Sequence, residues 1–461
     1  MAVLCRFVDS VSASPSVRLD LNDGTTWRLQ EDDTDLTPPS LRRGGATTML
    51  ADGGIYPASA YDNRTLRLRF LLSTANADAA TAELQKLNRQ LNRVAGVGQP
   101  DNILIWAPHT SSPVFFRTFR SDFNNVNVVA NDTAGGQLLL TVTVLAEPFA
   151  LGLEQSLGSI TVNNDPAAGT NGLYLDVANP LGDVETPLYL RTTSSLAGLT
   201  CLLATRRRGD PSAGTYVRQA ETLTQGTNTT VQANNASFSG AGSNWSRTAF
   251  PDTAWQNRLT GTFPSATASP ELRGTYRVFL RGRASATGST MLVKLRSNPN
   301  GTLIDNGEVT VPDSTTLQLI DLGLLQVPFG AGATADGYGT LMGAGGVECA
   351  IRARRTAGTA SFDYDYVFLA PADTELALVS WPSSPSGPAW VFDGPNDDVY
   401  WRGTAGTTHV VASAGASPTY MGGLPKLTPG QASRVFFVLL NGSVSATTQF
   451  TASYWPRFLS I

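Results

Sequence analysis

The feature that most constrains the fold is a run of alternating residues at 361–369, which reads SFDYDYVFL. Aromatic rings occupy every second position, at Phe362, Tyr364, Tyr366 and Phe368. Because successive side chains of a strand point to opposite faces, this period of two predicts a β-strand with one buried aromatic face. Similar short runs, separated by turn residues, recur along the whole chain. A mainly β protein made of sandwiches is therefore expected.

The composition agrees with many short strands joined by turns. Charged residues make up 15% of the 461 residues, whereas about 25% is usual in soluble domains. Glycine (44) and proline (27) are plentiful, as turns require. At roughly 150 residues per domain, the length suggests about three domains.

The first part of the chain, residues 1–154, is predicted to be a β domain with one helix. Two alternating runs around Asn22, Asp23 and Gly24 predict a hairpin over residues 17–29. Residues 65–72 predict a further strand. Residues 31–60 show little periodicity, so we expect a long loop or an extended arm there.

A single helix is predicted over residues 77–95, packed across one face of the sheet. Thr74 or Asn76 can cap its start and Gly96 its end. Its apolar residues recur at intervals of three and four, namely at Ala80, Leu84, Leu87, Leu91 and Val94.

Two further domains are predicted after residue 154. Residues 221–375 carry seven to nine short strands with regular turns, which is typical of a jelly-roll sandwich. We expect residues 155–220 to pair with residues 376–461 in a second β-sandwich, into which the jelly roll is inserted. Three consecutive domains are the alternative.

Charge and cysteine content narrow the class of partner. A net charge of -4 and a pI near 5.4 argue against a nucleic-acid surface, and the basic clusters at 206–208 and 352–355 are interpreted as solvated strand ends.

Cys5, Cys201 and Cys349 are far apart and are expected to be buried and unpaired, as in a reducing cytoplasm. No secretory leader and no apolar stretch long enough to insert into a membrane is recognised.

The sequence offers little for catalysis, and we predict that the protein is not an enzyme and has no cofactor. Only two histidines occur, and neither a nucleophile elbow nor a phosphate-binding loop is present. Asp363 and Asp365 share the polar face of their strand and are expected to face solvent. Their alternatives are a weak calcium site and, less favoured still, a glycosidase-type carboxylate pair.

Two tryptophans outside the obvious strands are candidates for carbohydrate binding. Trp245 and Trp255 could stack on a sugar ring while Arg247 and Asp252 bond its hydroxyl groups. For either tryptophan taken alone, a role as a core anchor at the end of the jelly roll is favoured.

The order of these elements resembles the distal tail protein family of long-tailed, non-contractile bacteriophages, enlarged by a carbohydrate-binding module. The likeness is carried by the N-terminal order of hairpin, loop, strand 65–72, helix 77–95 and further strands through Phe149. It is also carried by the jelly-roll ending FDYDYVFLAP at 362–371. It covers most of the chain as architecture, without a short specific motif, and the C-terminal half is larger than the family implies.

The resemblance implies a structural virion protein at the tail tip, made in the host cytoplasm. Residues 1–154 would be a belt-type ring-forming domain, commonly in six copies, and residues 155–220 with 376–461 a galectin-like sandwich. The implied partners are further copies of the chain, the tail tube protein, the tail-tip hub protein and a host cell-wall glycan, with no nucleic acid and no membrane insertion. Another minor tail protein and a free-standing surface adhesin or lectin are the alternatives.

Overall fold

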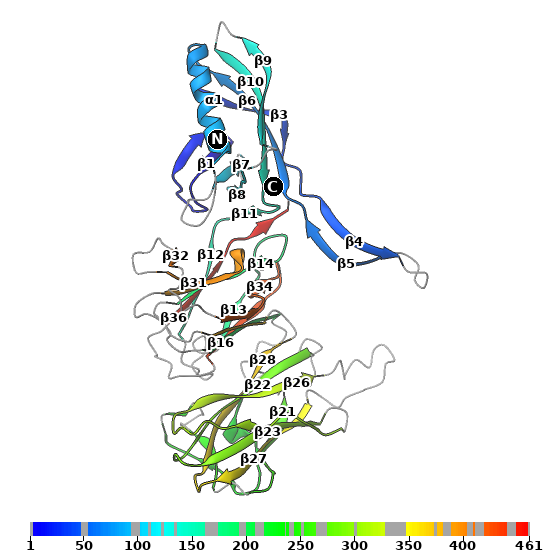
Figure 1. Cartoon of the computed structure of the whole chain (residues 1–461), viewed down its shortest axis with the longest axis vertical. Coiled ribbons are helices and arrows are strands. Elements are labelled where there is room, and N and C mark those ends of the chain that lie inside the picture. The colour runs from blue at the N-terminus through cyan, green and yellow to red at the C-terminus, as the bar shows by residue number, and fades with distance from the viewer. Residues whose placement is uncertain are drawn as a thin grey trace. The chain divides into compact units, whose positions relative to one another are not determined.

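A computed structural model of the chain shows a mainly β protein, as the strand pattern predicts (Figure 1). The chain divides into two compact units. The first unit comprises Met1–Gln155, Leu181–Thr186 and Tyr454–Ile461, and the second comprises Ser156–Pro180 and Pro187–Ser453. The structure describes residues 3–47, 54–93, 102–108, 112–120, 124–132, 136–161, 174–192, 200–207, 216–235, 237–238, 244–249, 253–263, 274–298, 302–327, 347–372, 376–380, 389–402, 409–410, 419–439 and 449–459.

Two antiparallel sheets form the first unit. One has six strands in the order β2, β1, β7, β8, β11, β37, and the other has four in the order β3, β6, β10, β9. The bounds are β1 (Leu4–Val8), β2 (Val17–Asp20), β3 (Trp27–Asp35), β6 (Arg64–Ser73), β7 (Ile103–Ala107), β8 (Val114–Arg117), β9 (Asn125–Asp132), β10 (Gln137–Ala146), β11 (Ala150–Leu151) and β37 (Arg457–Phe458).

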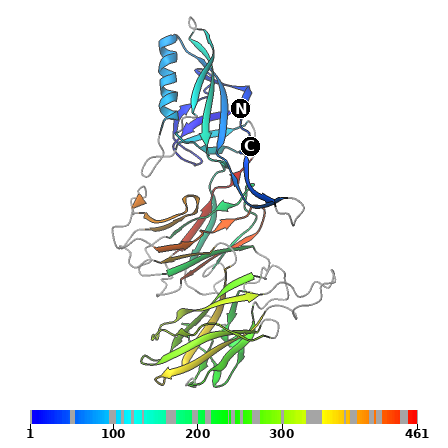
Figure 2. The same cartoon turned by 45° about the vertical axis from the view of Figure 1, so that its right-hand side comes forward.

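The predicted helix is α1 (Ala77–Leu91), and it packs on β10 and β2. Asn76 caps it, since its side chain accepts a hydrogen bond from the Ala79 amide at 2.9 Å. The helix ends four residues earlier than predicted, with Asn92 rather than Gly96 as its C-cap. Its buried Leu87 and Leu91 join one apolar core with residues of both sheets. Figure 2 shows the helix beside the strands of its unit.

The predicted hairpin over residues 17–29 is wrong. β2 pairs with β1, whereas β3 pairs with β6 in the other sheet. Leu21 and Trp27 are both fully buried in the core between the sheets, so the chain crosses from one sheet to the other at this point. The Asp23 carboxylate holds the crossing by accepting the amides of Thr25 and Trp27 at 2.8 and 2.9 Å.

Residues 31–60 are not a loop in the described part of the chain. They contain the end of β3 and most of a separate two-stranded sheet of β4 (Leu41–Thr47) and β5 (Gly54–Tyr61), which we call the arm. Figure 1 shows the arm leaving the two sheets of its unit. The two strands pair through backbone hydrogen bonds, which do not require an apolar alternation in the sequence.

Arg64 ties the end of the chain into the first unit. Its side chain is 1% exposed and donates to the carbonyls of Thr37 at 2.8 Å, Leu36 at 3.1 Å and Leu459 at 2.6 Å. Burial lowers the pKa of this guanidinium, but the three carbonyls compensate part of the lost hydration. Since Leu459 lies 395 positions along the chain, the first unit is complete only when the C-terminal segment has returned to it.

The second unit begins with what we call the flanking sandwich, whose strands come from both sides of residues 217–371. One sheet runs β12, β36, β15, β30, β31, β32, and the other runs β13, β35, β16, β29, β33. Phe437 of the second sheet packs on Phe392 and Phe450 of the first, with ring centroids 6.3 and 3.5 Å apart. The bounds are β12 (Gln155–Thr161), β13 (Tyr174–Val177), β14 (Thr186–Pro187), β15 (Tyr189–Thr192), β16 (Thr200–Arg207), β29 (Leu376–Ser380), β30 (Ala389–Asp393), β31 (Asp398–Arg402), β32 (His409–Val410), β33 (Thr419–Gly422), β34 (Lys426–Leu427), β35 (Ser433–Leu439) and β36 (Gln449–Tyr454).

Between these strands lies what we call the middle sandwich. Its β28 sheet runs β19, β20, β28, β22, β26, with β17 also on β28, and its β27 sheet runs β18, β21, β27, β23, β24, with β25 also on β23. The bounds are β17 (Val217–Gln219), β18 (Thr224–Gln225), β19 (Thr229–Gln232), β20 (Trp245–Thr248), β21 (Gln256–Phe263), β22 (Gly274–Ala284), β23 (Thr290–Asn298), β24 (Ile304–Asp305), β25 (Val309–Thr310), β26 (Gln318–Val327), β27 (Val347–Ala357) and β28 (Phe362–Pro371).

One apolar core continues from the middle sandwich into the flanking sandwich. The Phe436 ring of β35 lies 5.3 Å from the Tyr216 ring and 5.7 Å from the Phe368 ring. Buried Arg434 pairs with Asp176 at 2.7 Å, and its guanidinium lies 4.0 Å from the Tyr174 ring. This packing makes the two sandwiches one compact unit.

Two smaller observations bear on the expectations above. Cys5, Cys201 and Cys349 are buried and unpaired, as predicted, and burial raises the pKa of each thiol. Among the helices that the structure describes, none has the length and apolar character needed to cross a membrane.

We expect Arg64→Met to lower the free energy of unfolding of the first unit by about 3 kcal/mol, because the carbonyls of Leu36, Thr37 and Leu459 lose their buried charged donor. Peptide-resolved amide hydrogen exchange should show faster exchange in β6 and β37. Arg67→Met on the same strand is the control, since Arg67 is exposed and should alter exchange little. Equal protection in both variants would contradict the role given to Arg64.

Candidate functional site

The polar side chains predicted to form a site lie on the outer faces of the middle sandwich. Its inner face is closed by the apolar core, in which Tyr276, Leu280, Ile351 and Phe368 are fully buried. The β28 sheet carries Trp245, Arg247, Asp363 and Asp365, whereas Trp255 immediately precedes β21 of the β27 sheet. The two tryptophans therefore belong to different sheets and do not form one site.

Trp245 is 8% exposed and lies at the start of β20. Its ring stacks on Phe238 with the centroids 4.6 Å apart and the planes 8° apart, and the Arg247 guanidinium lies 5.9 Å from its ring. One ring face is thus occupied by Phe238. This placement matches the core-anchor alternative.

The expectation that Asp363 and Asp365 face solvent is wrong. Every residue of β28 is buried, and both carboxylates are 0% exposed. β28 is a central strand of its sheet, with β20 and β17 on one side and β22 on the other. A carboxylate on such a strand is desolvated, and it remains stable there only if it is paired.

Arginines from the neighbouring strands supply the pairing. Asp363 lies directly between Arg247 of β20 and Arg283 of β22 in the strand register. Arg247 binds it with two hydrogen bonds of 2.6 and 2.9 Å, and Arg283 approaches to 3.3 Å. The bond to Asp363 raises the pKa of the Arg247 guanidinium.

Asp365 is held in the same way by Arg281 of β22. It is also the extra residue of a β-bulge, because Arg281 pairs with Tyr366 and the next residue, Gly282, pairs with Tyr364. Guanidinium groups thus occupy the sites where a calcium ion would bind these carboxylates, and among the described residues no group of three or more His, Cys, Asp or Glu could hold a metal.

The fourth residue of the predicted sugar site, Asp252, lies outside the described residues.

Trp255 has a different environment, on the outer face of the β27 sheet. Its ring is half-buried, with the Lys294 ammonium 4.5 Å and the Arg354 guanidinium 5.1 Å from its centroid. Arg352 donates to the Trp255 carbonyl at 3.0 Å, which fixes the backbone beside the indole. Aromatic and cationic groups therefore meet at one half-buried place on this face.

The cluster at 352–355 does not consist of solvated strand ends, contrary to the sequence interpretation. Arg352 and Arg354 lie within β27 and form ion pairs with Asp305 at 3.5 Å and Glu308 at 3.0 Å. The cluster lies nearly 100 positions from Trp255 in the sequence, so no local pattern connects the two. Only the pairing of β21 with β27 brings them together.

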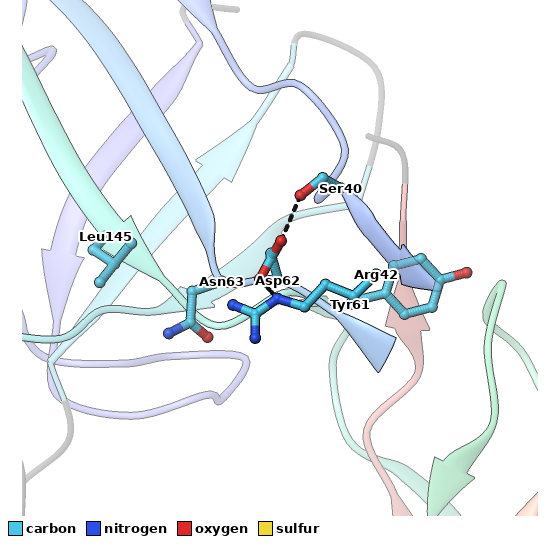
Figure 3. Close-up of a pocket in the computed structure, with 6 residues that line it drawn as sticks. All are labelled: Ser40, Arg42, Tyr61, Asp62, Asn63 and Leu145. Atoms are coloured by element: carbon cyan, nitrogen blue, oxygen red, sulfur yellow. Dashed lines mark hydrogen bonds and ion pairs between the residues drawn. The ribbon is translucent and has the colours of Figure 1, made fainter. Parts of the chain in front are cut away.

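A cavity lined mainly by polar residues lies at the base of the arm (Figure 3). This open cavity of about 560 Å³ is lined by Ser40, Arg42, Tyr61, Asp62, Asn63 and Leu145. The Asp62 carboxylate accepts a hydrogen bond from Ser40 at 2.8 Å and pairs with Arg42, as the dashed lines in Figure 3 mark. These contacts fix the two strands where they enter the arm.

Comparison with known proteins gives only distant likenesses. No protein-family model matches the chain, and no curated protein sequence matches it. Among solved structures, the Dit protein of phage SPP1 is similar over 80% of this chain and 99% of that protein, at 12% identity and a TM-score of 0.30. The baseplate of phage P2 in its activated conformation with calcium is similar over 98% of each chain, at 9% identity and a TM-score of 0.32.

A third likeness is to a tandem of CBM22 domains from Paenibacillus barcinonensis Xyn10C. It covers 52% of this chain and 95% of that one, at 11% identity and a TM-score of 0.22. At such values no binding residue is transferred from any of these structures to this chain.

We expect Asp363→Asn to lower the free energy of unfolding of the middle sandwich by roughly 2 to 3 kcal/mol, because it removes the charge that compensates Arg247 and Arg283. Chemical unfolding should measure the loss. The matched control is Asp321→Asn on β26 of the same sheet, where the pair with Arg277 is about one-third exposed, and its effect should stay below about 1 kcal/mol. Equal losses of unfolding free energy in the two variants would show that the burial of Asp363 does not determine the size of the loss.

Proposed function

We propose that this chain is a structural protein of a phage tail tip. In this proposal, residues 1–154 assemble with further copies into a ring, with six as the expected number, between the tail tube and the tip hub. Residues 221–375, a jelly roll inserted into the sandwich of residues 155–220 and 376–461, present a face that binds host-surface glycans. The proposal agrees with the kind of protein that the structural comparison returned, but it rests on features of this chain.

The observation that carries the proposal is the arm. β4 and β5 pair with each other and, among the described strands, with no other strand. A two-stranded ribbon is marginally stable alone in water, so a ribbon that leaves its own sheets gains stability by lying on another surface. In a ring of identical subunits, that surface is the neighbouring copy.

The four-stranded sheet of the first unit also supports assembly with further copies of the chain. β9 forms an edge of its four-stranded sheet, and Val128 and Val129 on it are 45% and 51% exposed. An open edge strand with exposed apolar residues is an aggregation hazard unless a defined partner covers it. Contact between copies in a closed ring would provide that cover.

The chemistry of the described acidic residues also favours a structural role over an enzymatic one. The carboxylates closest to a catalytic pair, Asp363 and Asp365, are buried and bound to arginines. A carboxylate held in this way is not free to act as a general acid or a nucleophile on a sugar. We therefore assign no catalytic residue.

Removal of the arm tests ring assembly. The Asp62 amide donates to the Ser40 carbonyl at 2.9 Å, so a two-glycine link can replace residues 41–61 without disturbing the strands on either side. We expect the intact protein, alone or with the tail tube protein, to form multimers of its 48.8 kDa chain, and the armless variant to remain a monomer. Mass photometry measures both, and circular dichroism checks that the variant is folded.

An armless protein that still forms rings of the same size would refute the role of the arm. An intact protein that remains monomeric even with the tail tube protein would refute the ring itself.

We further expect Val129→Lys to weaken assembly, because a charge would be buried at the covered edge. Leu324→Lys is the matched control: Leu324 is 56% exposed and lies on β26, an edge strand of the β28 sheet that the proposal leaves outside the ring. Sedimentation over a range of concentrations should separate the two variants. Equal loss of assembly in both variants would show that the contact between copies does not lie at the β9 edge.

A further inference from the structure

We infer that the outer face of the β27 sheet binds a polyanionic glycan, through Trp255 together with Lys294, Arg296, Arg352 and Arg354. This inference rests on the proposed glycan-binding role and specifies the chemical class of the ligand. We call the five side chains the cationic platform.

The strand geometry places the four cations on one surface. Arg352 and Arg354 alternate along β27 with the buried Ile351 and Ala353, so they point away from the core. Lys294 and Arg296 alternate in the same way with buried residues of β23. Since β23 and β27 are neighbours, all four cations share the outer face.

The register then brings two like charges directly opposite each other. Lys294 pairs with Arg352 across the two strands. Like charges in this position destabilise a sheet, so a sequence selected for stability alone would not favour them. Burial lowers the pKa of Arg352, repulsion from Arg296 lowers it further, and attraction by Asp305 acts in the opposite direction.

Among the residues that the structure describes, the carboxylates near the platform are fewer than the cations. Asp305 forms two hydrogen bonds with Arg296, at 2.6 and 2.8 Å, and also lies 3.0 Å from Lys294 and 3.5 Å from Arg352. Arg296 holds the pKa of Asp305 below its usual range, so this charge is constant across the physiological pH range. Glu308 pairs with Arg354.

Among the described residues, the four cations therefore share their face with three carboxylates. Asp305 and Glu308 form ion pairs with them, and Glu348 lies on the same strand face four residues from Arg352. This local excess of positive charge occurs in a chain whose net charge is -4. The favoured ligand is accordingly negative rather than neutral.

The indole adds selectivity for a sugar over a simple anion. Trp255 is half-buried, and Lys294 and Arg354 lie against its ring, so its position is fixed before a ligand arrives. An aromatic ring offers an apolar surface to a pyranose, whereas the guanidinium of Arg354 offers charge-assisted hydrogen bonds to a carboxylate or phosphate. The combination suits a polymer that carries both rings and regularly spaced negative groups.

The test compares polymers that differ only in charge. Binding of the full-length protein to polygalacturonate and to its methyl-esterified, neutral form can be measured by calorimetry or biolayer interferometry. A poly(glycerol phosphate) arm distinguishes phosphate from carboxylate as the recognised group, and single-stranded DNA of similar charge density tests for non-specific attraction. We expect binding to at least one acidic polymer, at least tenfold weaker binding to the neutral form, and weaker binding as salt rises.

Matched variants locate the site. Arg354→Gln should weaken binding by about tenfold, the loss expected for one charge-assisted hydrogen bond. Arg277→Gln removes the same charge from an exposed ion pair on the β28 sheet and should change binding less than twofold. Trp255→Leu should weaken binding to the acidic sugar polymer more than binding to DNA.

The outcomes separate this inference from the proposed function. Equal or tighter binding to the neutral polymer would overturn the polyanion inference while leaving glycan binding in place. Equal binding to DNA, or equal loss in Arg277→Gln, would also overturn it. Binding to none of the polymers would overturn both the inference and the glycan-binding role, but ring assembly is measured independently.

Discussion

The fold depends on strand pairing between segments that lie far apart in the sequence. In the first unit, β11 pairs with β37, and Arg64 binds the carbonyl of Leu459. In the second unit, β16 pairs with β29 and β35, which follow the whole middle sandwich. Because buried backbone groups must be hydrogen-bonded, neither the first unit nor the flanking sandwich can be completed until its returning strands are in place.

This nested pairing explains how a large insertion is accommodated. Ala204, near the end of β16, lies opposite Leu376 at the start of β29, so the chain leaves and re-enters the flanking sandwich at neighbouring points. An insertion whose ends are close costs its host little. The aromatic contacts of Phe436 with Tyr216 and Phe368 then pack the insertion against its host. A sandwich packed in this way keeps a fixed orientation relative to the flanking strands.

Arginine has two distinct uses in this low-charge protein. Arg64, Arg247 and Arg434 are tied to carbonyls or carboxylates, and in these places the cation stabilises packing. On the outer face of the β27 sheet, in contrast, Arg352 and Arg354 belong to a group in which cations outnumber carboxylates.

The sequence by itself determined the class of structure and its strongest elements. Period-two alternation identified β6 and β28, and three-to-four spacing with Asn76 as cap identified α1, because these patterns follow from the geometry of single elements. It also indicated Trp255 as a candidate for carbohydrate binding, but could not separate it from Trp245, since both lie outside the obvious strands in polar surroundings.

Tertiary structure alone decided which strands are neighbours, and this pairing determined everything else about the candidate site. Asp363 and Asp365 were expected in solvent because alternation reports only two faces of a strand. The alternation does not report that both faces of β28 are covered. It also does not report that arginines of β20 and β22 flank the two aspartates. Likewise, residues 17–29 have the local pattern of a hairpin but divide between two sheets, and Trp255 meets Arg354 only through the register of β21 and β27. Local patterns depend on backbone geometry within a few residues, whereas burial and charge compensation depend on partners that the chain brings together from more than 80 positions away.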